Sequence, residues 1–248
     1  MNTLDVSKIK VIAMDLDGTL TQHKQPLTPA NRAALEALAQ KYHLVMAGAG
    51  QVMRIFNQLE QFPIDVIGNY GLQYGKYNHE TKQLDIIRDE VFPCDRESVD
   101  KRVTMLRQKY GFTEFRGENT EFHPSGCVTF HVLGTKALQE DKLAFDPDRA
   151  KRRPGYPRVC ELFSDYTVFI GGSSSYDIVP HPYNKLYALD RFCEQHGYTR
   201  DDVVYFGDDY GPGGNDFQVY DAGVDFITID NYHDFGKRAQ QLLDAVKE

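Results

Sequence analysis

The segment VIAMDLDGTL, Val11 to Leu20, leads from an apolar run directly into two aspartates that are separated by one residue. Its four leading apolar residues predict an interior strand of a parallel sheet. Asp15 and Asp17 follow at the end of that strand, where two carboxylates repel each other and are costly to remove from water. A divalent cation bound between them is the simplest compensation.

Around this segment, apolar strands alternate with helical patterns. Residues 9–16 form the first predicted strand, and Thr28 followed by Pro29 is a favourable start for a helix that buries Leu35, Leu38 and Tyr42. The segments YHLVMAG, residues 42–48, and IDVIGNYG, residues 64–71, read as further strands. This order predicts βαβ units, and therefore an α/β fold with a parallel sheet.

The alternation breaks in the middle of the chain. A helix is expected near residues 96–110, GCVTFHVLG (126–134) alternates like a half-exposed antiparallel strand, and residues 167–180 read as a strand pair. We therefore predict two domains: a catalytic core made of residues 1–82 and 181–248, and an inserted α+β cap made of residues 83–180.

The α/β pattern returns at the end of the chain. Lys185 opens a predicted helix, and VVYFGDD (203–209) and DFITID (225–230) are predicted strands. A closing helix is expected to bury Phe235, Ala239, Leu242, Leu243 and Val246.

Composition excludes several classes of protein. The net charge of the 248 residues is −8, which argues against nucleic acid or an anionic membrane as a partner. The four cysteines form no CxxC pair, so neither a cysteine zinc site nor a disulfide framework is expected. No apolar run is long enough for a membrane span, and no export signal is expected. These features favour a cytoplasmic protein.

A second pair of carboxylates, Asp208 and Asp209, follows the strand VVYFG. Ligands of open α/β sheets bind outside the carboxyl ends of the strands, so this pair is expected near Asp15 and Asp17. Such a group of hard oxygen ligands suits Mg²⁺. Lys185 is predicted at a helix start on the same edge. A carboxylate nucleophile, a metal and a lysine together are typical of phosphoryl transfer.

Three motifs in order resemble the haloacid dehalogenase (HAD) superfamily: DLDGTL at 15–20, NKLYALDRF at 184–192 and GDDYGPGGND at 207–216. Further segments are similar to its phosphomannomutase branch and the neighbouring sugar-phosphate phosphatases. These segments are TQHKQPLT (21–28), NYGL (69–72), FRGE (115–118), GGSSSYDIVP (171–180) and PGGND (212–216). The resemblance implies a Rossmann-like core with a cap that covers the substrate.

The resemblance also implies roles for individual residues. Asp15 would be the nucleophile that forms an aspartyl phosphate, and Asp17 would be the general acid and then the base. Mg²⁺ would be held by Asp15, by the backbone carbonyl of Asp17 and by Asp208, and Lys185 would neutralise charge near the phosphate. Asp209, Asn215 and Asp216 would support the metal indirectly. Lys24, Arg116, Ser175 and Asp177 would contact the substrate.

Three features of the sequence depart from the family pattern. The second motif normally supplies a hydroxyl to the phosphate, but here MAGAG places Ala47 and Ala49 there, so backbone N–H groups near Gly48 are expected to bind the phosphate. Cys127 stands where the mutases have an arginine, and Lys24 also replaces an arginine. A basic run from Arg149 to Arg158 is interpreted as a solvated helix face, although it could supply arginines to the site.

The sequence leaves three functions open. The first is a Mg²⁺-dependent phosphatase acting on a small phosphorylated metabolite such as a sugar phosphate. The second is a phosphomannomutase-type phosphohexomutase, and the third is a weakly active or non-catalytic phosphate-binding protein. The resemblance also implies a possible homodimer formed through the cap.

Overall fold

The computed structural model describes residues 5–245 as two compact units, each formed from separate stretches of the chain. The core unit contains Met1–Asp89, Lys185–Gly211 and Asp216–Glu248, and the cap unit contains Glu90–Asn184 and Pro212–Asn215. Val246, predicted to be buried in the last helix, lies outside the described residues, as do residues 1–4. Both units mix helices and strands, which confirms the predicted α/β class with an α+β insert.

A seven-stranded sheet, in the order β11-β10-β1-β2-β3-β4-β5, forms the centre of the core unit. The first five strands in this order are parallel, and the last two pairings are antiparallel. The strands are β1 (Val11–Met14), β2 (His43–Ala47), β3 (Asp65–Gly68), β4 (Gln73–Asn78), β5 (Gln83–Asp89), β10 (Val203–Gly207) and β11 (Asp225–Thr228). Every residue of β1, β3 and β10 is buried, as expected for strands covered on both faces.

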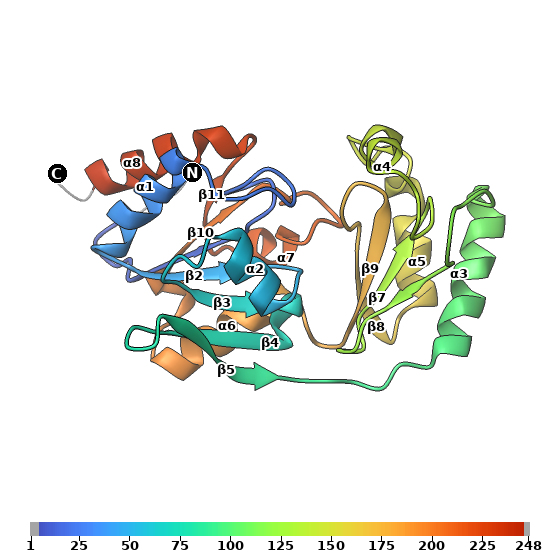
Figure 1. Cartoon of the computed structure of the whole chain (residues 1–248), viewed down its shortest axis with the longest axis horizontal. Coiled ribbons are helices and arrows are strands. Elements are labelled where there is room, and N and C mark those ends of the chain that lie inside the picture. Colours follow the sequence, from blue (N-terminus) through green and yellow to red (C-terminus); the bar gives the residue numbers. More distant parts are fainter. Residues whose placement is uncertain (1–4, 246–248) are drawn as a thin grey trace. The chain divides into compact units, whose positions relative to one another are not determined.

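Helices cover the two faces of this sheet separately. On one face, apolar residues of α1 (Pro29–Ala39), α2 (Val52–Gln58) and α8 (Phe235–Ala245) pack on the sheet, and on the other face those of α6 (Lys185–His196) and α7 (Phe217–Asp221) do so. Figure 1 shows α1 beside α8, with α6 across the sheet from them. The Thr28 side chain accepts a hydrogen bond from Asn31 N, so α1 begins where the sequence predicts.

The cap unit is built on a four-stranded antiparallel sheet in the order β6-β7-β9-β8. Its strands are β6 (Glu121–Phe122), β7 (Val128–His131), β8 (Tyr166–Phe169) and β9 (Ser175–Pro180), and its helices are α3 (Arg96–Tyr110), α4 (Gln139–Phe145) and α5 (Tyr156–Leu162). Apolar residues of α3 and α5 share one cluster with Val128, Phe130 and Ile178 of the sheet. Helix α3 has the predicted bounds, because Asp95 caps its start and Gly111, in the left-handed region at φ 72°, ends it.

The structure corrects the domain boundaries. Strand β5 was predicted to belong to the cap, but it pairs with β4 along its length and extends the core sheet to Asp89. The chain returns to the core at Lys185 rather than at residue 181. The hairpin is hard to predict because β5 is an edge strand: Ile86 and Ile87 are exposed, so the segment lacks the apolar alternation of a half-buried strand.

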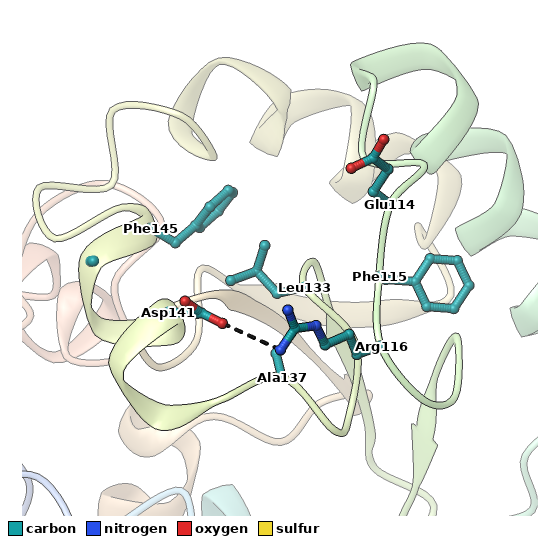
Figure 2. A pocket seen from close by; sticks show the side chains of 8 residues that line it. Glu114, Phe115, Arg116, Leu133, Ala137, Asp141 and Phe145 are labelled. Atoms are coloured by element: carbon teal, nitrogen blue, oxygen red, sulfur yellow. Dashed lines mark ion pairs between the residues drawn. The ribbon is translucent and has the colours of Figure 1, made fainter.

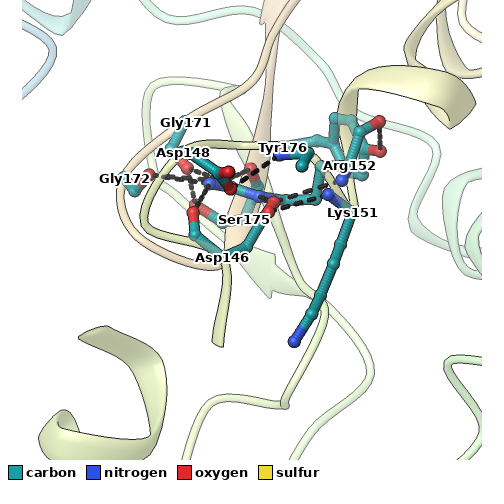
Figure 3. Close-up of polar contacts among 9 residues, drawn as sticks. Asp146, Asp148, Lys151, Arg152, Gly171, Gly172, Ser175 and Tyr176 are labelled. Atoms are coloured by element: carbon teal, nitrogen blue, oxygen red, sulfur yellow. Dashed lines mark hydrogen bonds and ion pairs between the residues drawn. The ribbon is translucent and has the colours of Figure 1, made fainter. Parts of the chain in front are cut away.

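The interpretation of the basic run as a solvated helix face is wrong for Arg152, whose side chain is fully buried in the cap. Its Nε donates to Asp146 Oδ2 at 2.7 Å, and its Nη1 donates to the carbonyl oxygens of Gly171 and Ser175 at 2.6 and 2.7 Å. Figure 3 shows this network around the loop that precedes β9. A buried guanidinium needs such partners, and here it fixes the shape of that loop.

Among residues 5–245, no helix has the length and apolar character that crossing a membrane would require.

Candidate active site

Four charged side chains from distant parts of the sequence meet at one edge of the core sheet. Asp15 follows β1 and Asp208 follows β10, while Lys185 is the first residue of α6 and Asp216 directly precedes α7. Strands β1 and β10 are parallel neighbours, so their carboxyl ends lie together, as the sequence predicts. One oxygen of each of the three aspartates lies within 4.8 Å of the others.

Lys185 links two of these carboxylates. Its Nζ donates to Asp15 Oδ1 at 2.5 Å and to Asp216 Oδ1 at 2.8 Å, and all three side chains are buried. Tyr205 on β10 donates its hydroxyl to the same Asp216 oxygen at 2.7 Å. The lysine is therefore held in place beside the predicted nucleophile, with its charge compensated from both sides.

Asp208 is positioned by the loop of the first motif. Its Oδ1 accepts a hydrogen bond from the Thr19 hydroxyl at 2.7 Å. Gly18 adopts φ 104°, and a Cβ atom there would lie 2.5 Å from Asp208 Oδ2. The glycine and threonine of DLDGTL thus have local physical roles: one makes room for the carboxylate, and the other orients it.

Burial and crowding perturb the titration of this group. Burial, aided by the charges of Asp216 and Asp208, raises the pKa of Asp15, although Lys185 acts in the opposite direction. Burial and the Asp216 charge raise the pKa of Asp208 to about 6. Burial alone would lower the pKa of Lys185, but the two carboxylates outweigh it and raise that pKa. One ammonium group for three carboxylates leaves excess negative charge, and this donor set fits a divalent cation with oxygen ligands.

The side chain of Asp17 belongs to a different set of contacts. Its Oδ1 accepts from Gln58 Nε2 at 2.7 Å and from the backbone N–H of Lys24 at 2.8 Å, and Arg54 Nη2 lies 3.5 Å from Oδ2. The backbone of Lys24 is in the left-handed region at φ 57°, and Lys24 is exposed to solvent. The structure thus groups Asp216, rather than the Asp17 carboxylate, with Asp15 and Asp208. Binding of a metal by the backbone carbonyl of Asp17 stays a prediction.

In the second motif, one of the backbone donors expected to bind the phosphate already has a partner. The Gly48 N–H donates to Ile67 O at 2.9 Å, so it is already used in bonding to the neighbouring strand and is a poor phosphate donor. Arg54 lies at this turn: a Cβ atom on Gly50 would lie 2.2 Å from Arg54 Nη2. Gly50 therefore gives space to the guanidinium of Arg54, whose side chain is 40% exposed and lies close to Asp17. A cation stands beside the position where the family uses a hydroxyl.

The sequence did not single out Thr19, Arg54, Gln58 or Tyr205. Arg54 and Gln58 occupy positions i and i+4 of α2, and Arg54 Nη1 donates to Gln58 Oε1 at 2.7 Å. Polar residues at that spacing mark one side of a helix, but the spacing does not show which active-site residue they face.

Two further predicted residues lie in the loop after β10. Asp209 is buried, and its N–H donates to Asp216 Oδ2 at 3.1 Å, which ties the loop to the base of the site. Asn215 belongs to the short segment that clusters with the cap unit, although Asp216 belongs to the core. A role of either residue in supporting the metal stays a prediction.

The predicted substrate residues of the cap come from different elements. Arg116 lines a pocket of about 450 Å³ with Phe115, Leu133 and Phe145, and its Nη1 lies 3.8 Å from Asp141 Oδ2 (Figure 2). Ser175, on β9, is buried and donates its hydroxyl to Gly171 O at 3.0 Å. Asp177 lies two residues further along β9, opposite Thr129 of β7.

Cys127 is also buried, and burial raises the pKa of its thiol to about 12, so the thiol is uncharged near neutral pH. It cannot replace the charge of an arginine. Whether the cap residues contact a substrate stays a prediction.

A parallel sheet with paired aspartate clusters at its carboxyl edge, a buried lysine between them and a large inserted cap is the arrangement of the HAD superfamily, and the protein is an enzyme of that class. The chain belongs to the eukaryotic phosphomannomutase family. The model of this family, described as "Eukaryotic phosphomannomutase", matches residues 96–244. The predicted superfamily and branch are thereby confirmed.

Individual relatives agree with this assignment. A probable phosphomannomutase of Caenorhabditis elegans is 24% identical over 97% of this chain and 98% of its own length. A phosphomannomutase of Drosophila melanogaster is 25% identical over the full length of both chains. Among solved structures, a haloacid dehalogenase-like hydrolase from B. subtilis superposes with a TM-score of 0.62 at 17% identity, covering 95% of this chain and 99% of its own. At that identity the structural likeness shows the fold.

Proposed function

We propose that this enzyme is a Mg²⁺-dependent phosphatase that hydrolyses a hexose phosphate or a similar small phosphorylated metabolite through an aspartyl phosphate on Asp15. The contact between Lys185 Nζ and Asp15 Oδ1 carries the proposed phosphoryl transfer to Asp15. A lysine ammonium held against a buried carboxylate lowers the cost of bringing a phosphate dianion to that carboxylate. The buried position also limits the access of water to the reacting group.

The remaining residues divide the chemistry. Asp15 attacks phosphorus, and Lys185 neutralises charge on the transferred group. Asp17 gives a proton to the leaving oxygen and then takes one from the attacking water. Its bonds to Gln58 and Lys24 N–H orient that carboxyl group. Arg54 supplies a positive charge beside Gly50, where it compensates for the absent hydroxyl of the second motif.

Asp15 and Asp208 would hold Mg²⁺ through their carboxylates, Asp17 would add its backbone carbonyl, and Asp216 would complete the negative field around the ion. When bound, the ion supplies positive charge that stabilises the phosphoryl group during transfer. It would also lower the raised pKa values of Asp15 and Asp208, because it offsets the repulsion between the carboxylates.

The proposal of hydrolysis rests on the cationic residues of the cap. A mutase must hold a second phosphate firmly while the bisphosphorylated sugar reorients, and bidentate arginines serve this best. Arg152 is committed to Asp146 and to backbone carbonyls. Arg107 is likewise buried and donates to the carbonyl oxygens of His131 and Val132. Neither guanidinium is free for a ligand, and weaker retention of the intermediate favours its hydrolysis.

Phosphomannomutase activity is the second candidate, and the family assignment favours it. Arg116 is 65% exposed and pairs loosely with Asp141, so it remains accessible to a distal phosphate. The core machinery described above serves both reactions, and the difference lies in how long the intermediate is protected from water.

A product analysis tests the choice. The enzyme is incubated with mannose 1-phosphate, Mg²⁺ and a catalytic amount of the corresponding bisphosphate, and mannose 6-phosphate and free phosphate are quantified over time. We expect release of phosphate to exceed interconversion of the two monophosphates. Conversion to the 6-phosphate with little free phosphate would establish the mutase instead, and neither product would contradict both.

The metal requirement gives a further prediction. Asp208→Asn removes a ligand charge while keeping its shape, so the Mg²⁺ concentration for half-maximal activity should rise on the order of 10- to 100-fold. Activity is measured in a Mg²⁺ titration after EDTA treatment. The exposed Asp201 of the one-turn helix Arg200–Asp202 provides the control, because Asp201→Asn should leave the titration unchanged. Full activity in EDTA would contradict the proposed metal site.

A further inference from the structure

A second group of potential ligands lies at the edge of the core sheet where β2 and β3 begin, opposite the edge that holds the carboxylate cluster. His43 is the first residue of β2, Asp65 is the first residue of β3, and His196 is the last residue of α6. One ligand atom from each of the three lies within 4.8 Å of the others. The proposed chemistry at Asp15 uses none of these residues.

The three side chains are held so that one atom of each turns toward the others. His196 Nδ1 lies 2.9 Å from Phe192 O, and because a carbonyl only accepts, this nitrogen carries the proton and leaves Nε2 as the inward atom. Asp65 Oδ1 accepts from Tyr77 N at 2.8 Å, so Oδ2 is the oxygen that faces His43 Nε2 at 3.1 Å.

His43 is supported on its outer side as well. Its Nδ1 lies 3.4 Å from the Tyr198 hydroxyl, which can either donate or accept and therefore suits both tautomers of the ring. Metal-binding histidines are commonly oriented by such a contact at the second nitrogen. Each of the three ligands thus has an outer partner.

The Tyr74 hydroxyl lies close to two of the three ligands. The Tyr74 hydroxyl donates to Asp65 Oδ2 at 2.8 Å and has no second proton for His196 Nε2, which lies 3.3 Å from its oxygen. In its neutral form with the proton on Nδ1, His196 presents the Nε2 lone pair on the side of His43 and Asp65, so the three inward atoms can be shared by one cation.

From this geometry we infer that His43, Asp65 and His196 form a second metal site, which binds Zn²⁺ or a similar transition metal. Two imidazoles and one carboxylate are a typical ligand set for zinc and leave one coordination position open. The His43 side chain is 29% exposed, which gives an ion access. The site also lies at the carboxyl end of α6, where the helix dipole favours a cation.

The inferred role of this site is structural. Helix α6 begins with Lys185 and ends with His196. A metal bound to His196 would fix the far end of α6 to β2 and β3. It would therefore stabilise the helix that positions the active-site lysine without taking part in the reaction there.

Isothermal titration of the full-length protein with Zn²⁺ tests the inference. The buffer contains excess Mg²⁺, and the protein carries Asp208→Asn, so that the carboxylate cluster at the other edge does not account for binding. We expect one Zn²⁺ per chain and an increase in the melting temperature with Zn²⁺. Co²⁺ should show visible absorption bands of a low-coordinate site with nitrogen ligands.

Separate His43→Gln and His196→Gln substitutions should each weaken this binding at least about tenfold, because each removes one ligand. His233→Gln, which changes an exposed histidine, is the matched control and should bind like the parent. Circular dichroism confirms folding, and the two variants serve as independent tests if one fails to fold. Absence of Zn²⁺ binding by the parent, or unchanged binding in both ligand variants, would show a hydrogen-bonded network only and overturn the inference.

Discussion

Asp15→Asn should abolish turnover, with a loss of about 10⁴- to 10⁶-fold in the rate of phosphate release, because an amide cannot replace the attacking carboxylate. The substitution should leave the fold intact. Lys185 keeps its 2.8 Å contact with Asp216, and the substitution removes one of the three crowded carboxylates. Phosphate release under substrate saturation and acid-quenched phosphoenzyme both report the loss.

The control is again Asp201→Asn, which removes an exposed carboxylate outside the site and should retain full activity. Near-ultraviolet circular dichroism of Asp15→Asn should match that of the parent. If Asp15→Asn retained activity within tenfold of the parent, Asp15 would not be the nucleophile, and the proposed aspartyl phosphate would be excluded.

The largest effect on stability is expected from Arg152→Met. It leaves the buried Asp146 without its guanidinium and removes one donor from each of two backbone carbonyls, so the free energy of unfolding of the cap should fall by about 3–5 kcal/mol. Burial lowers the pKa of Arg152, but an arginine guanidinium still carries its charge near neutral pH. Despite burial, the hydrogen bond and the charge of Arg152 lower the pKa of Asp146. The loss is measured by urea unfolding monitored through the hydrogen exchange of cap amides.

Two variants separate the mechanism from a general effect of losing an arginine. Arg153→Met changes the exposed neighbour and should alter stability by less than about 0.5 kcal/mol. Arg152→Met combined with Asp146→Asn removes the uncompensated charge and should recover part of the loss. Equal destabilisation by Arg152→Met and Arg153→Met would mean that the buried ion pair does not account for the stability of the cap.

The sequence alone determined the class of fold and the centre of the site. Apolar strands that end in carboxylates occur in parallel sheets, and the carboxyl ends of such strands share one edge, so Asp15 and Asp208 were predictable as neighbours. Lys185 was predictable too, because it opens a helix that returns to that edge. The bounds of α3 and the start of α1 were also predictable, because helix capping depends only on nearby residues.

Only the tertiary structure decided which polar residues serve the site and which serve the fold. Arg152 and Arg54 both look like surface cations in the sequence, but one is buried against Asp146 and the other lies over Gly50 beside Asp17. The histidine–aspartate group at the opposite edge joins residues from two strands and a helix. Side-chain partners far apart in the chain depend on how strands and helices pack, and local periodicity carries no information about such pairings.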